Sequence, residues 1–162
     1  MEKIYYNNPL LNRSSELRKD EIFLRSILDS QNVNFIPMRD DENYFLSEKD
    51  EIKPLILKRQ ELELYTKDIN LDKMIFLGKI NEKFYFSINI KSKIDKNNLE
   101  IDQGDIITDQ LRNVIGSLTE LDSSYLALAK GMIFWHKKNK FCGVCGSKTK
   151  TVEAGFVLRC IN

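Results

Sequence analysis

Three cysteines, Cys142, Cys145 and Cys160, are the residues of this 162-residue chain whose type and spacing best indicate chemistry. Cys142 and Cys145 stand in a Cys-x-x-Cys-Gly arrangement. This spacing is typical of a zinc knuckle, in which a tight turn presents two thiolates to one tetrahedral ion and glycines adopt the backbone angles of the turn. Fourteen residues separate Cys145 from Cys160, a usual interval to the second knuckle of a zinc ribbon. The three cysteines are therefore the predicted zinc ligands.

The predicted zinc site is incomplete within these residues. A second Cys-x-x-Cys would place its last cysteine at position 163, one residue beyond Asn162. A four-cysteine structural site contributes an apparent binding energy of about 10–16 kcal/mol to folding, and we expect three thiolates to contribute less. His136 is an alternative fourth ligand, but it lies six residues before Cys142 at a predicted helix end, where a histidine is more often a surface cation or a capping group.

Two other interpretations of the cysteines are a redox dithiol and inert thiols. A redox Cys-x-x-Cys usually begins a helix that follows a strand, where the helix dipole lowers the thiol pKa. Here the pair follows a predicted helix and lies among glycines and lysines, which favours zinc. An odd number of cysteines is also a poor fit to a secreted disulfide framework. Glu153 is the only acid near the site in sequence, so we do not expect catalysis by a zinc-bound hydroxide.

The overall composition is that of a globular protein. Charged residues make up 30% and hydrophobic residues 42% of the chain, and the formal net charge is +1, which argues against a strongly basic nucleic-acid binder. The sequence shows neither a signal peptide nor a long apolar run, and it predicts a cytoplasmic protein without a membrane segment. Only the C-terminal stretch is locally basic, through Lys137, Lys138, Lys140, Lys148, Lys150 and Arg159. A solvated face is the default interpretation of these cations, and contact with a phosphate or an RNA end is the alternative.

The hydrophobic pattern predicts an α+β fold with a mostly antiparallel sheet, two C-terminal helices and an incomplete zinc ribbon. Strands or strand-like segments are expected at 32–38, 44–46, 55–57, 62–65 and in a hairpin at 73–90, a short helix at 20–29, a loop at 91–103, and further helices at 106–115 and 122–135. Pro37 suggests that its strand is an edge or a strand end. The helix at 122–135 carries few charges, so we expect it to be surrounded on nearly all sides at the centre of the fold. Residues 1–13 are expected to form an ordered arm that packs Leu10 and Leu11 on the domain.

Several of these segments together resemble one family. Trp135-His136, Phe141-Cys142-Gly143-Val144-Cys145-Gly146, Glu153-Ala154-Gly155 and Arg159-Cys160 are similar to the start of the zinc ribbon in NADH pyrophosphatases, the NAD(+) diphosphatases of the Nudix hydrolase superfamily. Asn8-Pro9-Leu10 with Arg13, the hairpin at 74–90 and the helix pair are similar to the N-terminal domain of that family, in the same order. Ala154 stands where the family often has glycine. The resemblance implies an N-terminal domain over 1–136 and a partial zinc ribbon over 137–162.

In that family a fourth cysteine and a Nudix domain follow, and the Nudix box binds magnesium or manganese and cleaves NAD(H) to NMN(H) and AMP, or removes NAD caps from RNA. These 162 residues contain no Nudix box, so we predict no catalytic and no cofactor-binding residue in them and expect this chain alone to be inactive. The resemblance implies zinc on Cys142, Cys145 and Cys160, and either a homodimer or a separate Nudix-domain chain as partner. The alternative is a stand-alone zinc-binding interaction module, or RNA-contacting module, that completes its metal site in trans.

Overall fold

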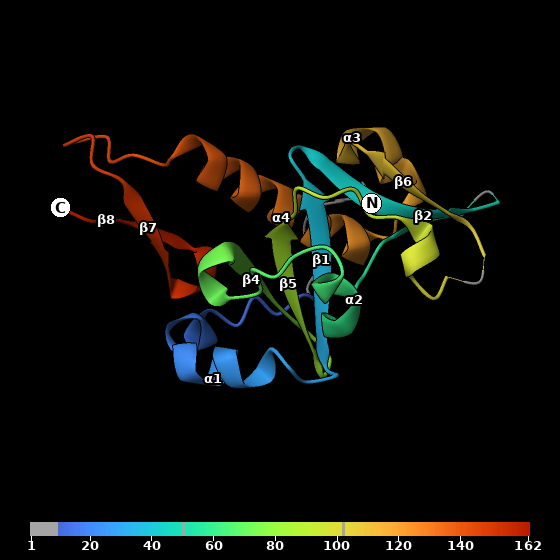
Figure 1. Ribbon diagram of the computed structural model, residues 1–162, viewed down its shortest axis with the longest axis horizontal. Coiled ribbons are helices and arrows are strands. Elements are labelled where there is room, and N and C mark those ends of the chain that lie inside the picture. Colours follow the sequence, from blue (N-terminus) through green and yellow to red (C-terminus); the bar gives the residue numbers. More distant parts are fainter. Residues whose placement is uncertain (1–9, 50, 102) are drawn as a thin grey trace, which may run out of the picture.

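A mixed six-stranded sheet and a separate two-stranded hairpin organise the protein (Figure 1). The computed structural model describes residues 10–49, 51–101 and 103–162. The sheet has the order β3-β2-β1-β5-β4, with β6 on β2, and only the β1–β5 pair is parallel. The predicted α+β class with a mostly antiparallel sheet is therefore confirmed.

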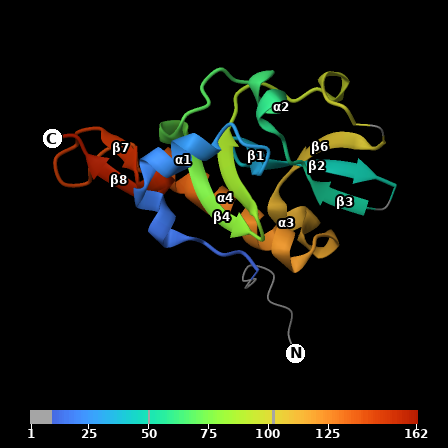
Figure 2. The ribbon, with the colours of Figure 1, turned by 90° about the horizontal axis from the view of Figure 1, so that it is seen from below.

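The helices and strands have the following bounds. The strands are β1 (Val33–Arg39), β2 (Glu42–Glu48), β3 (Glu51–Pro54), β4 (Met74–Ile80), β5 (Lys83–Asn89), β6 (Asp105–Asp109), β7 (Thr149–Val152) and β8 (Val157–Cys160). The helices are α1 (Glu21–Ile27), α2 (Arg59–Glu63), α3 (Leu111–Val114) and α4 (Glu120–Lys138). In Figure 2 the β7–β8 hairpin and the β2–β3–β6 end of the sheet lie at opposite ends of the molecule.

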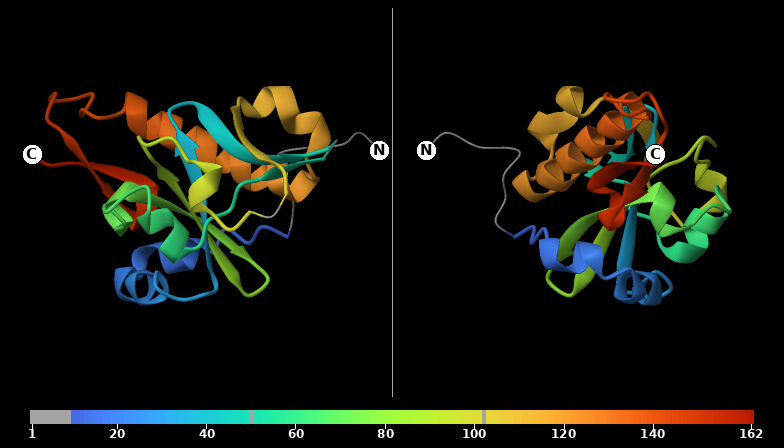
Figure 3. Two further views of the ribbon diagram at one scale, coloured as in Figure 1. Left: turned by 45° about the vertical axis from the view of Figure 1, so that its right-hand side comes forward. Right: turned by 90° about the vertical axis from the view of Figure 1, so that its left-hand side faces the viewer.

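Each face of the sheet carries its own core, because strand side chains alternate between faces. One core packs α1 and α2 against the sheet and includes Leu24, Phe35, Leu62, Phe76 and Phe86. The other packs α3 and α4 and includes Ile36, Phe45, Leu77, Leu111 and Leu126. Figure 3 shows α4 on one side of the sheet and α1 and α2 on the other.

The strand that contains Pro37 is central, so of the two predicted alternatives, an edge or a strand end, the edge is wrong. Strand β1 pairs with β5 along its length, whereas β2 joins its other side only from Met38 onward. Phe35 directs its N–H and C=O to Leu57, away from β5. Pro37 is two residues after Phe35, so its backbone nitrogen also faces away from β5. The N–H that proline lacks would therefore not have formed a hydrogen bond to β5.

Two predicted elements have the wrong type. The segment predicted as a strand at 62–65 belongs to the short helix α2 and the turn that ends it. At the start of α2, the Glu61 carboxylate accepts a hydrogen bond from the Lys58 N–H at 2.6 Å. Ile106 and Ile107, predicted as the start of a helix, lie in strand β6. Ile106 packs against one core and Ile107 against the other, so a pair of adjacent apolar residues serves two faces of a sheet.

Helix α4 covers the sheet with one face and is not surrounded. It begins at a Thr119 cap, whose hydroxyl accepts from the Asp122 N–H at 3.0 Å, and it buries Tyr125, Leu126, Ala129 and Ile133 among others. On the outer face Phe134 is 49% exposed. In the part of the chain that the structure describes, no helix is long and apolar enough to cross a membrane.

The predicted N-terminal arm is only partly covered by the structure. Residues 1–9, which include Asn8 and Pro9, lie outside the described residues. Leu11 packs against the α4-side core, and Leu10 is 63% exposed. Asn12 joins β4 through backbone hydrogen bonds to Lys79 in both directions, at 2.9 and 2.7 Å.

The turn of the β7–β8 hairpin, at Glu153–Gly155, is inserted against strand β4. Ala154 is 6% exposed within the core, and Gly155 has a φ of +97°. A Cβ atom on Gly155 would lie 2.9 Å from Ile75 Cγ1 and 3.0 Å from Ile75 Cα. Glycine is therefore required at this position both by its backbone angle and by the closeness of β4.

We expect Gly155→Ala to lower the free energy of unfolding by about 2–4 kcal/mol, from left-handed backbone strain and overpacking against Ile75. Gly131→Ala is the matched control. Gly131 lies inside α4 with nothing near its Cβ position, so alanine there should raise stability by about 0.5–1 kcal/mol. Urea unfolding followed by far-UV circular dichroism measures both. Equal effects of the two variants would contradict the proposed close contact of the hairpin turn with β4.

Candidate metal centre

The first two cysteines lie in a tight turn directly after α4. The Gly146 N–H donates to the Cys142 carbonyl at 2.9 Å, and the Cys142 N–H donates to the Ser147 carbonyl at 2.7 Å. Gly146 has a φ of +72°, the left-handed conformation that favours glycine. The sequence therefore folds locally into the predicted knuckle, with both cysteines on one compact loop.

Cys160 reaches the same place from the end of strand β8. The hairpin register pairs Thr149 with Cys160, and the Ile161 N–H donates to the Lys148 carbonyl at 3.2 Å. Phe141 in turn bridges to Lys148. The knuckle and the end of the hairpin are thus joined side by side by backbone contacts.

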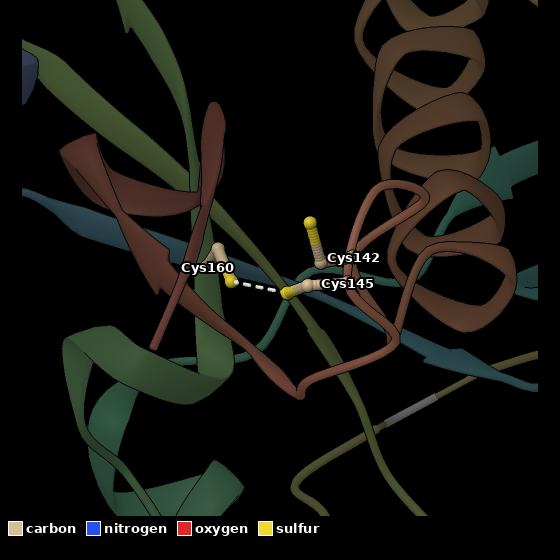
Figure 4. Close-up of side chains that lie close together, drawn as sticks. All are labelled: Cys142, Cys145 and Cys160. Atoms are coloured by element: carbon tan, nitrogen blue, oxygen red, sulfur yellow. Dashed lines mark hydrogen bonds between the residues drawn. The ribbon is translucent and has the colours of Figure 1, made fainter. Parts of the chain in front are cut away.

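The three thiols converge on one point (Figure 4). All three Sγ atoms lie within 4.8 Å of one another, and Cys145 Sγ is 3.4 Å from Cys160 Sγ. Ligands on a tetrahedral zinc ion at Zn–S distances of about 2.3 Å are separated by about 3.8 Å. The observed spacing therefore suits one ion, and the three clustered cysteines could bind zinc.

Hydrogen bonds give the thiols different acidities. The side chain and the backbone of Ser147, followed by the Cys160 thiol, hydrogen-bond to the Cys145 sulfur and lower its pKa to about 6. The Asn162 N–H favours the Cys160 thiolate, but the hydrogen bonds with Cys145 and Cys142 together with desolvation raise the pKa of Cys160. Cys145 is therefore the more acidic of the two thiols that form the short sulfur contact.

His136 does not join the three thiols. Its Nε2 lies 2.6 Å from the Gly155 carbonyl oxygen and therefore donates its proton to the hairpin turn. His136 thereby ties the end of α4 to the hairpin. Glu153, the one acid near the cysteines in sequence, lies in that same turn, at the end of the hairpin opposite Cys160.

The sequence did not indicate which residues hold the hairpin in place. The ring of Phe156, next to the turn, has the Arg18 guanidinium 3.5 Å from its centroid and that of Arg13 at 5.6 Å. Burial, and next the charge of Arg13, lower the pKa of Arg18. These residues are far apart in sequence and carry no local pattern. Ser147, in contrast, could have been suspected from its place directly after the knuckle.

Fold and site together define an α+β protein whose C-terminal hairpin and knuckle form a zinc ribbon. Comparison with protein families agrees: the family model of the NADH pyrophosphatase zinc ribbon domain matches residues 137–162. The chain therefore contains an NADH pyrophosphatase zinc ribbon domain at these residues, with its three cysteines gathered in one cluster.

In the metal-free protein, the rate of Cys145 alkylation by iodoacetamide should rise with pH around a midpoint of about 6, because the thiolate is the nucleophile. Ser147→Ala should move this midpoint upward, since the serine side chain is the largest cause of the lowered pKa. Cys142 and Cys145 share the tryptic peptide 141–148, so fragment ions of this peptide in tandem mass spectrometry identify alkylation at Cys145. A midpoint at the ordinary thiol value in the parent chain would contradict the described hydrogen bonds.

Proposed function

We propose that residues 1–162 form the non-catalytic part of a zinc-containing NADH pyrophosphatase of the Nudix superfamily, with zinc held by Cys142, Cys145 and Cys160. The observation that carries this proposal is the match of the zinc ribbon family at residues 137–162, combined with the convergence of the three thiols. In this proposal residues 1–136 are the N-terminal domain of that family. The zinc is structural and joins the knuckle to the hairpin.

The ribbon also has features of a surface that contacts another domain. Three large apolar side chains near the thiols are strongly exposed: Phe141 at 61%, Val144 at 98% and Ile161 at 59%. Exposed apolar groups gathered in so short a segment are typical of interaction surfaces. A Nudix catalytic domain is the partner we propose for this surface, either from a separate chain or within a homodimer. NAD(H) or NAD-capped RNA would then be bound only through that domain.

The zinc assignment predicts about one zinc ion per chain in protein purified without chelators. Cys160→Ser should lose most of this zinc because it leaves two thiolates. His136→Gln is the matched control and should keep the zinc, because the imidazole binds the Gly155 carbonyl and lies apart from the thiols. Inductively coupled plasma mass spectrometry after gel filtration measures the zinc. Zinc loss from the histidine variant alone would reverse the ligand assignment.

The absence of a Nudix box from these 162 residues predicts no cleavage of NADH to NMNH and AMP by the zinc-loaded chain. Chromatography of the nucleotide products after incubation with magnesium or manganese tests this. Addition of a Nudix domain from an NADH pyrophosphatase as a separate chain should restore turnover if this chain is its accessory part. Turnover by the repurified chain alone would overturn the non-catalytic role.

A further inference from the structure

The sulfurs of Cys145 and Cys160 lie in contact although the two residues belong to different segments. Cys145 lies in the knuckle, Cys160 ends strand β8, and their Sγ atoms are 3.4 Å apart. The sulfur–sulfur distance of a disulfide is about 2.05 Å, so these atoms need to approach by about 1.4 Å to bond. In Figure 4 the two sulfurs point toward one another, whereas the sulfur of Cys142 points away from the line that joins them. Cys145 and Cys160 are therefore the pair placed for a disulfide.

Backbone hydrogen bonds hold the two segments of this pair together. The Ile161 N–H donates to the Lys148 carbonyl at 3.2 Å, which fixes the end of β8 beside the start of β7. The Thr149 N–H donates to the Lys140 carbonyl at 3.0 Å, which fixes β7 beside the segment that enters the knuckle. Two cysteines form an unstrained disulfide only where the backbone already presents them at the right separation. Cys145 and Cys160 therefore need little backbone movement to bond.

Cys145 is open to small solutes. It is exposed, whereas Cys160 is half-buried. Val144, next to Cys145, is 98% exposed, so this part of the knuckle projects into solvent. Cysteines that respond to oxidants are accessible to solvent and lie next to a second cysteine that resolves the first oxidation product. Cys145 meets both conditions, with Cys160 as the resolving residue.

We propose that Cys145 and Cys160 form a redox switch, in which hydrogen peroxide converts the two thiols into a disulfide and zinc leaves the cluster. The Cys145 sulfur attacks one peroxide oxygen, the O–O bond breaks, and a sulfenic acid forms while water leaves with the thiol proton. The Cys160 sulfur then attacks Cys145 Sγ, the S–O bond breaks, and a second water leaves with the Cys160 proton. The two sulfurs together lose two electrons, and the peroxide gains them.

The disulfide removes two of the three zinc ligands. Zinc binds thiolates, and a disulfide sulfur carries no charge with which to hold the ion. Cys142 is then the one thiolate left in the cluster. In the zinc-loaded cluster both sulfurs begin as thiolates, so the two protons of the departing water come from solvent. Zinc release rests on the zinc site proposed above, whereas disulfide formation requires no zinc.

The switch acts on the segments that carry the exposed apolar side chains. Val144 directly precedes Cys145, and Ile161 directly follows Cys160. The disulfide would keep the knuckle joined to the hairpin after zinc has left. A catalytic domain docked on this surface would cover Cys145, so oxidation is a reaction of the chain before docking.

Peptide mapping of the oxidised chain identifies which sulfurs bond. Metal-free, reduced protein is treated with an equimolar amount of hydrogen peroxide, blocked with iodoacetamide and digested with trypsin without reduction. Cys142 and Cys145 share peptide 141–148, and Cys160 lies in peptide 160–162. We expect these peptides to be linked through Cys145, with iodoacetamide on Cys142. The linked form should exceed the internal Cys142–Cys145 disulfide by about tenfold or more, because only Cys145 and Cys160 are in contact and point toward one another.

Cys142→Ser is the matched control for loss of one thiol. In metal-free protein it should form the link between Cys145 and Cys160 at a rate within about twofold of the parent, because Cys142 takes no part in the reaction. Cys160→Ser should instead accumulate a sulfenic acid at Cys145, which dimedone labels, because the resolving thiol is gone.

Zinc release is measured on the zinc-loaded parent chain with the chromogenic chelator 4-(2-pyridylazo)resorcinol. About one zinc ion should leave per disulfide formed, and dithiothreitol should restore both the thiols and zinc binding. The switch is overturned if the internal Cys142–Cys145 disulfide predominates, if Cys142→Ser fails to cross-link, or if the cross-linked protein keeps its zinc. Protein that binds no zinc when reduced would count against the proposed function alone, because the peptide mapping uses metal-free protein.

Discussion

The insertion of the hairpin turn against β4 is the contact on which the placement of the zinc ribbon depends. Gly155 lies so close to Ile75 that no side chain fits between them, and Ala154 belongs to the core beneath the sheet. Phe156 adds a ring stacked on Arg18. A hairpin of two four-residue strands has little core of its own, so this anchoring supplies the burial that the hairpin alone lacks.

The same anchor determines where the metal centre can form. His136, near the end of α4, donates to the Gly155 carbonyl, so the helix end and the hairpin turn are held together. The knuckle follows α4, and Cys160 is the last residue of β8, so both ligand segments start from elements that the anchor holds in place. At the far end of the ribbon, by contrast, Phe141, Val144 and Ile161 are exposed, and burial contributes little there. The thiol cluster, with the zinc we propose for it, is the interaction suited to hold that end together.

Local sequence patterns predicted the elements whose stabilising contacts are also local. Alternation along Phe84, Phe86 and Ile88 identified the β4–β5 hairpin, and Cys-x-x-Cys-Gly identified the knuckle. Elements whose type depends on distant partners were predicted wrongly. Ile106 and Ile107 form a strand because they pair with β2. Pro37 lies in a central strand because no strand among the described residues pairs with it on the side opposite β5. The pairing of Arg18 with Phe156 joins two ends of the chain, and no single segment could reveal it.

The thiol cluster differs from a set of three equivalent ligands. Hydrogen bonds with Ser147 lower the pKa of Cys145, whereas the contact with Cys145, at a sulfur distance of 3.4 Å, helps to raise the pKa of Cys160. Zinc binds thiolates, so an ion held by the three cysteines would displace the proton shared between Cys145 and Cys160. Because Cys160 lies on the hairpin and Cys145 on the knuckle, that proton loss would replace a weak sulfur hydrogen bond between the two segments with metal–sulfur bonds. Metal binding would therefore strengthen the contact between the knuckle and the hairpin. Backbone contacts among Phe141, Lys148 and Ile161 already hold these two segments together.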